Sequence, residues 1–325
     1  MQPGVGVDLG ATATIQAKEA QSFSETFLNL IPKNPVKAMV EGNVLQIIVF
    51  AILFGISLNL TGKVGEPLVK VIDAIAEAMY KLTAIVMELA PYGVFALMAY
   101  VAQQYGLSVL IPLLKVLVGV YLGCLVHAFF TLGGAVAVIG KLNPLKFFKG
   151  IIDALAIAYS TASSSGTLPV TIRCARKKLG VSDSISSFVL PLGATINMDG
   201  TAMYQGVAAL FVAQAYGIDL SFGNYVTIIL TSTLASIGSA GVPGAGLIML
   251  TLVLNSVGLP IEGIAIIAGI DRVLDMARTT VNVVGDCMVT VLIAKSEKEL
   301  NKIFNKINFK KYIFISSAWL VKLND

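Results

Sequence analysis

The segment "SIGSAGVPGAG" (Ser236–Gly246) decides how this chain folds, because it interrupts 42 consecutive residues without a charge, Leu220–Ile261. Such a run is too long for one crossing of a bilayer, which takes about 20 residues. Glycine and proline in the middle cannot continue a regular helix, and the two flanks are each too short to cross separately. The segment therefore predicts a re-entrant hairpin over residues 220–261, with both ends on one face of a membrane.

A second stretch, residues 145–180, has the same organisation. An apolar run leads into the small and polar "TASSSGTLP" (Thr161–Pro169), which we predict as the tip, and a short apolar run ending in "RCARKK" follows. Each hairpin is followed by a helix with polar residues in it, 182–217 and 264–295. Paired broken segments in corresponding positions are typical of inverted repeats in secondary transporters, with the substrate site between them.

Composition places the chain in a membrane. Of 325 residues, 56% are hydrophobic and 13% are charged, against about 25% charged in an ordinary soluble domain. The net charge of +4 is too small to indicate nucleic-acid binding and bears instead on orientation. Lysine and arginine gather in 141–149, 173–178 and 295–311, whereas 216–224 and 255–263 have none. The positive-inside rule makes the first three cytoplasmic and the last two external, so the hairpins are predicted to enter from opposite faces.

These features predict an all-α, multi-pass protein of the cell membrane, embedded in the lipid bilayer. We expect spans near 43–62, 72–103 and 107–140 in addition to the hairpins and helices above. The division is an external loop at 1–42, scaffold helices at 43–106, a transport core at 107–296 that contains both hairpins, and a cytoplasmic tail at 297–325.

The stretch "DRVLDMARTTVNVVGD" (Asp271–Asp286) carries five charged residues in the last apolar span. Each charge left unpaired at mid-bilayer costs about 2.5–3.5 kcal/mol, so these residues indicate a function. Six polar positions fall on one stripe of a helix: Asp271, Asp275, Arg278, Thr279, Asn282 and Asp286. We expect Asp271 and Arg272 to form a flanking charge pair.

The chemistry of the stripe predicts two kinds of ligand. The planar fork of Arg278 suits a carboxylate, Asp275 suits an ammonium group, and Thr279 adds a hydroxyl. Asn282 and Asp286 offer oxygens alone, as do the polar residues of "NMDGT" (Asn197–Thr201). Oxygen ligands with one or two carboxylates suit a small dehydrated cation.

Four motifs, "SSSGTLPVT", "LPLGATINMDGTA", "LASIGSAGVPGAG" and "DMARTTVNVVGD", stand in order along the chain. With them, residues 2–295 resemble the glutamate/aspartate transporters of the dicarboxylate/amino acid:cation symporter family. The resemblance implies a homotrimer whose protomers move a substrate-carrying domain against a scaffold, an elevator-like form of alternating access. It also implies that three transmembrane helices precede the point at which this sequence starts, and that the third completes a sodium site with Asp199. The tail from Asn301 matches nothing in the family.

The resemblance assigns roles to individual residues. It gives Arg278 the substrate's side-chain carboxylate and Asp275 its α-amino group. The implied substrate contacts are Ser164, Ser165, Thr201, Val242, Gly246, Asp275, Arg278, Thr279 and Asn282. Three implied sodium sites take Gly193, Asn197, Asn282 and Asp286; Thr195, Ser236, Ile237 and Ser239; and Asp199. No cofactor is expected beyond a coupling ion, Na⁺ or H⁺.

Two departures from the family pattern bear on these roles. Ala162 replaces an arginine that precedes the tip serines in archaeal relatives, and Arg272 is expected to supply that charge from the last helix. Gln205 stands where proton-cotransporting animal members have a glutamate, which favours sodium and leaves the ion open. Asp275 and Arg278 together favour L-aspartate or L-glutamate over a C4-dicarboxylate, which remains the alternative substrate class. A non-transporting fragment also remains an alternative.

Two functions other than transport are considered from the same residues. An intramembrane hydrolase would pair Ser164 or Ser165 with the single histidine, His127, which must lie within hydrogen-bond reach; His127 is expected instead to be a packing or interhelical residue. A channel would need rings of ligands or filters open to both sides, whereas hairpins from opposite faces indicate alternating gates. The chain is not expected to be an enzyme.

Overall fold

A computed structural model of the chain describes residues 31–40, 44–89, 110–237 and 239–301, with six single positions between 92 and 103. Within these ranges the structure is helical, and strand pairing is limited to one antiparallel bridge between Val181 and Leu300. The prediction of an all-α fold is confirmed for this part of the chain. The predicted loop 1–42 and tail 297–325 fall largely outside it, although Pro35–Val40 forms a short helix, α2.

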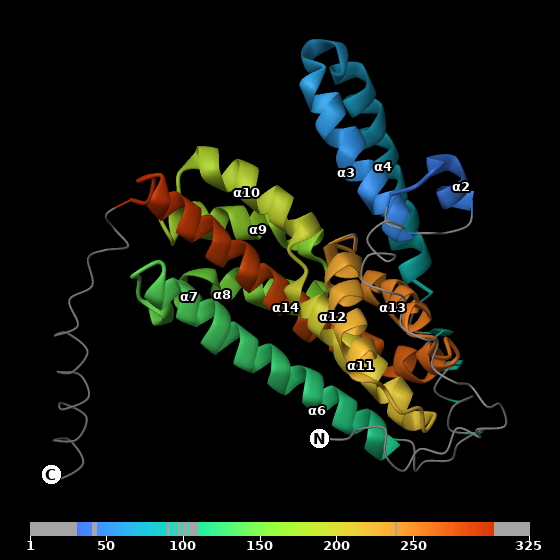
Figure 1. Cartoon of the computed structure of the whole chain (residues 1–325). Helices are drawn as coiled ribbons and strands as arrows, with labels where there is room; N and C mark the ends of the chain where they lie inside the picture. Colours follow the sequence, from blue (N-terminus) through green and yellow to red (C-terminus); the bar gives the residue numbers. More distant parts are fainter. Residues whose placement is uncertain are drawn as a thin grey trace, which may run out of the picture.

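Two helices project away from the rest of the described chain (Figure 1). They are α3 (Val44–Leu60) and α4 (Glu66–Met87), joined by the 3₁₀ turn Gly62–Val64. The predicted span 43–62 agrees with α3. The span predicted over 72–103 is wrong at its start, because Glu66 and Pro67 favour the first turn of a helix and α4 begins there. Glu88 and Leu89 form a turn after α4, and the six described positions between 92 and 103 are again helical.

A long apolar rod follows, as predicted over 107–140. It consists of α6 (Leu110–Val126), a π-helical turn at His127–Leu132 and α7 (Gly133–Val138). Two described helices are long and apolar enough to cross a membrane, this rod at Ile111–Val138 and the last helix, α14 (Gly263–Ser296). At about 1.5 Å per residue, each exceeds the roughly 30 Å of a bilayer's apolar core.

Residues 145–180 form a pair of packed helices, α8 (Pro144–Thr161) and α9 (Ser164–Lys177). Asn143 caps α8 by accepting hydrogen bonds from the next turn, and Ala162 ends it in the left-handed conformation at φ 53°. Ser163 then caps α9 at Gly166 N. The predicted tip Thr161–Pro169 is therefore too long, because a serine N-cap restarts the helix at once; only two residues separate α8 from α9.

Residues 220–261 form the second pair, α12 (Phe222–Ile237) and α13 (Ala245–Ser256), which also pack together. The connection between them is longer and ends at Gly244, whose φ of 78° is open to glycine. The two connections meet, because Ser163 Oγ donates to Gly241 O at 2.7 Å and Ser165 N donates to the same oxygen at 3.1 Å. Sequence patterns 78 residues apart thus make one contact.

The predicted helix 182–217 is divided into α10 (Asp183–Ile196) and α11 (Asp199–Ala215). Asn197 and Met198 leave the helical region between them, at the "NMDGT" motif. In contrast, α14 runs through the whole charged stretch as one unbroken helix of 34 residues. It packs against α6, α8, α10 and α11 and forms the centre of the body (Figure 1).

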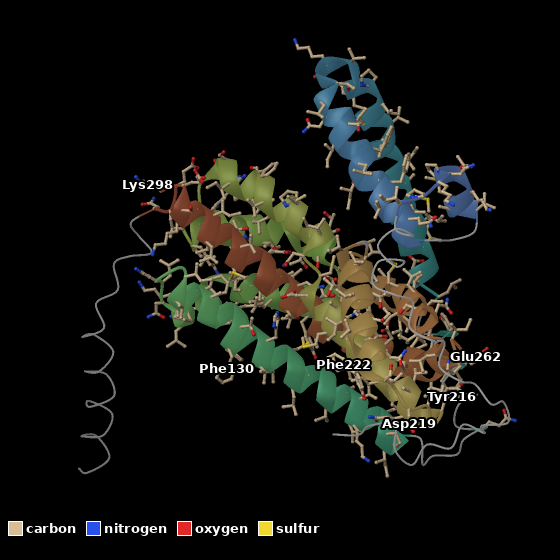
Figure 2. The ribbon with its side chains drawn as sticks, in the orientation of Figure 1. Phe130, Tyr216, Asp219, Phe222, Glu262 and Lys298 are labelled. Atoms are coloured by element: carbon tan, nitrogen blue, oxygen red, sulfur yellow. The ribbon has the colours of Figure 1, made fainter. Side chains whose placement is uncertain are left out.

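The loops that are rich in lysine and arginine and the loops that lack them lie at opposite ends of this body. Figure 2 shows Tyr216, Asp219 and Glu262 together at one end and Lys298 at the other. At the Lys298 end, Lys295 Nζ donates to Gly140 O, and Asn301 N donates to Gly180 O at 2.8 Å. The described parts of the three stretches rich in lysine and arginine therefore meet at one end, and the two loops without lysine or arginine, 216–224 and 255–263, lie at the opposite end.

Candidate substrate and cation site

Three breaks in the helices lie close to the polar stripe of α14. They are the break between α10 and α11, the connection between α8 and α9, and the connection between α12 and α13. All six members of the stripe are buried, between 1% and 6% exposed: Asp271, Asp275, Arg278, Thr279, Asn282 and Asp286. The sequence prediction of a single protected polar face is confirmed. The apolar residues between these positions pack in the surrounding core, so burial is possible because a helix separates the two faces.

Glycines allow the backbones to approach at this crossing. A Cβ on Gly200 would lie 2.4 Å from Arg278 O, and one on Gly285 would lie 2.5 Å from Asn197 Nδ2. A Cβ on Gly193 would lie 2.7 Å from Asp286 Oδ1. Real side chains do not approach so closely, so the fit of α14 against the α10–α11 break depends on these three glycines.

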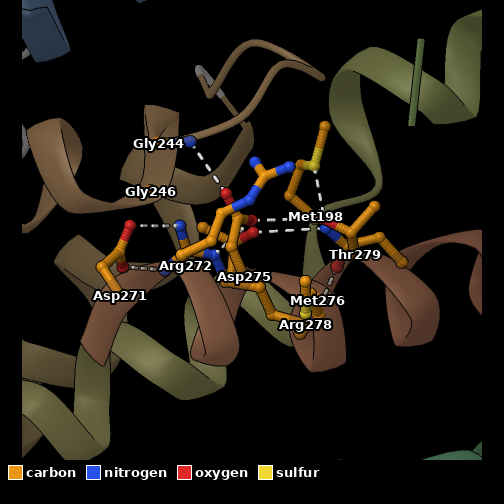
Figure 3. Close-up of polar contacts among 12 residues, drawn as sticks. Met198, Gly244, Gly246, Asp271, Arg272, Asp275, Met276, Arg278 and Thr279 are labelled. Atoms are coloured by element: carbon orange, nitrogen blue, oxygen red, sulfur yellow. Dashed lines mark hydrogen bonds and ion pairs between the residues drawn. The ribbon is translucent and has the colours of Figure 1, made fainter. Parts of the chain in front are cut away.

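Arg278 is the most buried charge of the site, at 1% exposed. Its Nη1 donates to Asp271 Oδ1 at 2.8 Å and its Nη2 to Asp271 Oδ2 at 3.4 Å, while its Nε donates to Asp275 Oδ1 at 2.8 Å. The guanidinium also lies 4.3 Å from the centre of the Tyr204 ring, a cation–π distance. The cation is therefore compensated within the protein, with one negative charge in excess (Figure 3).

The expected pairing of Asp271 with Arg272 is wrong. Asp271 lies seven residues before Arg278, two turns along the same face, and pairs with it. Arg272 projects from another face, where its Nη2 donates to Thr161 O at 3.4 Å, at the end of α8. A helix rotates adjacent residues by about 100°, so neighbours in sequence cannot share one face. Arg272 does lie beside the connection of the first helix pair, as expected from its predicted role there.

Asp275 connects the stripe to the second helix pair. Its Oδ2 accepts a 2.8 Å hydrogen bond from Gly244 N, and its Oδ1 accepts one from Thr279 Oγ1 at 3.2 Å (Figure 3). Gly246 lies against the guanidinium, because a Cβ there would be 3.0 Å from both Arg278 Cζ and Thr201 Cγ2. The connection between α12 and α13 thus covers the charged part of the stripe.

A pocket opens beside these groups, with about 210 Å³ of empty space including the part open to solvent. It is lined by residues of α14, of both connections, of the α10–α11 break and of the first turns of α9, α11 and α13: Ala162, Ser164, Met198, Thr201, Ser239, Ala240, Gly241, Val242, Gly246, Asp275, Arg278, Thr279 and Asn282. Eight of the nine residues predicted to contact a substrate are among them. Ser165 is not, since it contacts Gly241 at the meeting of the two connections.

Oxygen atoms lie close together at the lower part of the stripe, which we define as Asn282 to Asp286. Asn197 Nδ2 donates to Asp286 Oδ1 at 3.0 Å and to the backbone oxygen of Asn282 at 3.3 Å. Within the described ranges no lysine, arginine or histidine lies at ion-pair distance from Asp286. Gly193 lies beside the same carboxylate, since a Cβ there would be 2.7 Å from Asp286 Oδ1. Four residues predicted for one sodium site are therefore neighbours, around one buried carboxylate without a cationic partner.

Asp199 has a partner that sequence analysis missed. His127 Nε2 lies 2.7 Å from Asp199 Oδ2, a contact 72 residues long in sequence between the π-helical turn and the start of α11. The expectation of an interhelical role for His127 is confirmed. Nothing in the local sequence of either residue signals this pairing, because it depends on how the rod packs against α11.

The remaining predicted ion ligands lie where α10 approaches the second connection. A Cβ on Gly241 would be 2.7 Å from Ala194 O, beside Thr195. Ser236 is buried near the end of α12, and Ser239 N donates to Ser236 O at 3.0 Å. The structure thus brings the two sides of this set, Thr195 on one and Ser236, Ile237 and Ser239 on the other, to adjacent elements.

The sequence is similar to those of known proteins. The profile described as "Sodium:dicarboxylate symporter family" matches residues 1–296. The chain is 40% identical over 310 residues to the "Proton/sodium-glutamate symport protein" of Bacillus caldotenax, covering 93% of this chain and 73% of that protein. It is 43% identical to the "Proton/glutamate-aspartate symporter" of Escherichia coli, covering 93% and 71%. It is also 43% identical to "Excitatory amino acid transporter 3" of Mus musculus, covering 80% and 50%.

Proposed function

This chain belongs to the sodium:dicarboxylate symporter family and is therefore a membrane protein, and from that premise we propose that it imports acidic amino acids by symport with Na⁺ or H⁺. The observation that supports this most is the pocket lined by Arg278, Asp275 and Thr279. It offers a guanidinium, a carboxylate and a hydroxyl within one helical stripe. L-aspartate and L-glutamate present the complementary carboxylate and ammonium groups.

Each substrate group has a chemical counterpart in the pocket. The Arg278 fork suits the side-chain carboxylate, because two parallel N–H donors match two oxygens, and Asp275 suits the α-ammonium. Thr279, Asn282 and Thr201 supply further hydrogen bonds. Ser164 and Ser165 at the start of α9, with Val242 from the second connection and Gly246 at the start of α13, enclose the ligand. A C4-dicarboxylate would leave Asp275 facing a second carboxylate, a repulsive arrangement.

The lower part of the stripe suits the coupling cation. Asn197 Nδ2 lies between Asp286 Oδ1 and Asn282 O, so oxygens from two residues already face one positive partial charge. A small cation with Asp286, Asn282, Asn197 and Gly193 as ligands would supply the charge that this carboxylate lacks. The second set comprises Thr195, Ser236, Ile237 and Ser239, and Asp199 belongs to a third site.

The arrangement of the helix pairs supports alternating access in a multi-pass protein of the cell membrane. The free ends of α8–α9 lie at the end rich in lysine and arginine, those of α12–α13 at the opposite end, and the two connections meet at the pocket. In a membrane, such pairs would be re-entrant hairpins of an inverted repeat that gate the site from opposite faces. We further propose a homotrimer with an elevator-like movement of the core.

The test is uptake of labelled L-aspartate by proteoliposomes that contain the chain, with Na⁺ and H⁺ gradients imposed separately. Uptake is expected under one of the two gradients, saturating with substrate and competed by L-glutamate. Competition by succinate stronger than by L-glutamate would favour a dicarboxylate as the substrate. Absence of gradient-driven uptake and of aspartate binding would contradict the proposal.

A further inference from the structure

Asp271 is the buried charge of the stripe to which the proposed function gives no task. It is 6% exposed, and it meets Arg278 with both carboxylate oxygens, at 2.8 and 3.4 Å. It does not line the pocket, whereas Arg278 and Asp275 do. The two terminal nitrogens of Arg278 therefore bind a residue that is not part of the pocket lining; Figure 3 shows these contacts.

The geometry of a guanidinium makes this pairing consequential. The group offers its N–H donors in one plane, and a carboxylate is bound most strongly through two parallel donors. Asp271 occupies the pair formed by Nη1 and Nη2, and Asp275 occupies Nε. The Tyr204 ring covers a face of the plane at 4.3 Å. A ligand carboxylate can accept two parallel hydrogen bonds from Arg278 only if one of the two aspartates releases the N–H donors that it binds.

The two aspartates are not equally able to do so. Asp275 is held by Arg278 Nε, Thr279 Oγ1 and Gly244 N, which fix it from two elements. The hydrogen bonds that hold Asp271 run to the same guanidinium that the ligand would bind. Asp271 also bears the same charge and the same fork-binding geometry as the ligand's side-chain carboxylate.

We infer that Asp271 is an affinity- and specificity-determining residue, a built-in competitor that holds Arg278 until a ligand carboxylate recruits the guanidinium into the pocket. The inference rests on the proposed function. A ligand with a carboxylate side chain compensates the guanidinium as Asp271 does, and a neutral ligand does not. Asp271 thus lowers the affinity of the site for acidic ligands, because they must displace it. It also keeps the Arg278 charge compensated in the empty site, where a buried charge without a partner would be strongly destabilising.

Neutralising Asp271 should therefore strengthen binding, which structural damage does not do. In Asp271→Asn the guanidinium keeps Asp275 as a counter-ion, so one buried charge still balances the other. The dissociation constant for L-aspartate is expected to fall by about tenfold, which corresponds to about 1.4 kcal/mol. The dissociation constant for L-asparagine, which lacks the side-chain charge, should stay unchanged.

The experiment is calorimetric titration of the purified chain in detergent at saturating Na⁺ and fixed pH, with Asp271→Asn and Asp271→Ala. Glu262→Gln is the matched control, because it removes an exposed carboxylate at the start of the same helix and reports any long-range effect of net charge. Tighter aspartate binding in both Asp271 variants, but not in the control, is the expected result.

Unchanged or weaker aspartate binding by a folded Asp271 variant would overturn the inference while leaving the proposed function intact. Loss of helical content in both variants, measured by circular dichroism, would show that the Asp271–Arg278 pair is a structural requirement and would also overturn it. If the unmodified chain bound no acidic amino acid, the proposed function would fail first.

Discussion

The two halves of the polar stripe on α14 differ in how their buried charges are compensated. In the upper half, from Asp271 to Thr279, carboxylates and a guanidinium compensate one another. In the lower half, Asp286 is equally buried, its carboxylate accepts a hydrogen bond from Asn197 Nδ2, and no cationic side chain of the described residues pairs with it. The Arg278 guanidinium is thus compensated without a ligand and must exchange partners to bind one, whereas the Asp286 carboxylate has no cationic partner among the described residues. The comparison predicts competition at one end and simple occupancy at the other.

The largest effect is expected from Arg278→Cys, which breaks the compensated half. Asp271 and Asp275 would remain buried without a cation, and breaking a buried pair costs about 3–5 kcal/mol. Aspartate affinity should fall by at least about a hundredfold, equivalent to about 2.8 kcal/mol, and the thermal midpoint should fall as well. Adding Asp271→Asn to this variant should restore part of the midpoint, because it removes one orphaned charge. Titration and thermal unfolding in detergent measure both; an unchanged aspartate affinity would refute the role of Arg278.

The next effect concerns the half that lacks a cation. Asp286→Asn removes its carboxylate, so the dependence of aspartate binding on the coupling cation should weaken by about tenfold or more, because one charged ligand is worth at least about 1.4 kcal/mol. Aspartate titrations over a range of Na⁺ concentrations and pH values measure this. Asp219→Asn is the matched control, since Asp219 is exposed at the end of the body. An identical cation dependence in Asp286→Asn and the control would be incompatible with a cation at Asp286.

Glycine substitutions should change cation affinity and aspartate affinity independently, one in each half of the stripe. In Gly193→Ala the new methyl would displace Asp286 Oδ1, 2.7 Å away, and cation affinity should fall by about tenfold with aspartate affinity at saturating cation little changed. Gly246→Ala, which crowds Arg278 and Thr201 at 3.0 Å, should show the reverse pattern. Gly206→Ala on α11 is the control, because nothing lies within 4 Å of its Cβ position. If both substitutions changed the two affinities alike, the halves would not be separable.

The smallest effect is expected at His127. Its hydrogen bond to Asp199 contributes about 0.5–1.5 kcal/mol, so His127→Ala should weaken cation binding only a few-fold and leave aspartate binding at saturating cation intact. His127→Gln keeps a donor and should lie closer to the unmodified chain. The same cation titrations test this. A complete loss of aspartate binding in both variants would place His127 in the substrate-binding half instead.

The sequence predicted elements well where the signal was periodic or compositional. The apolar rod near 107–140, the two helix pairs and the last helix follow from hydropathy and from glycine and proline positions. Boundaries were less predictable. The first tip was drawn too long because "SSSGTLP" reads as a loop, although Ser163 caps a helix that tolerates Pro169 inside it. A cap and a loop use the same residue types, and only the hydrogen bond from Gly166 N distinguishes them.

The sequence predicted which charged residues share one face of the last helix better than it predicted which of them form ion pairs. The spacing of Asp271, Asp275 and Arg278 put them on one face, but sequence proximity favoured Arg272 as the partner of Asp271, and the structure pairs Asp271 with Arg278. The bond between His127 and Asp199 had no local signal. Re-entrance of the hairpins, the trimer and the identity of the coupling ion stay predictions.

By itself, the sequence determined the helical class and the polar stripe on the last helix, because helical periodicity and the cost of apolar exposure act locally along the chain. It also indicated the break at Ser236–Gly246, since several glycines and a proline close together disfavour a continuous helix. Only the tertiary structure decided which charge compensates which, and that the two connections meet at Gly241. Those contacts join residues far apart in sequence, and their strength depends on distance and direction, which no local pattern encodes.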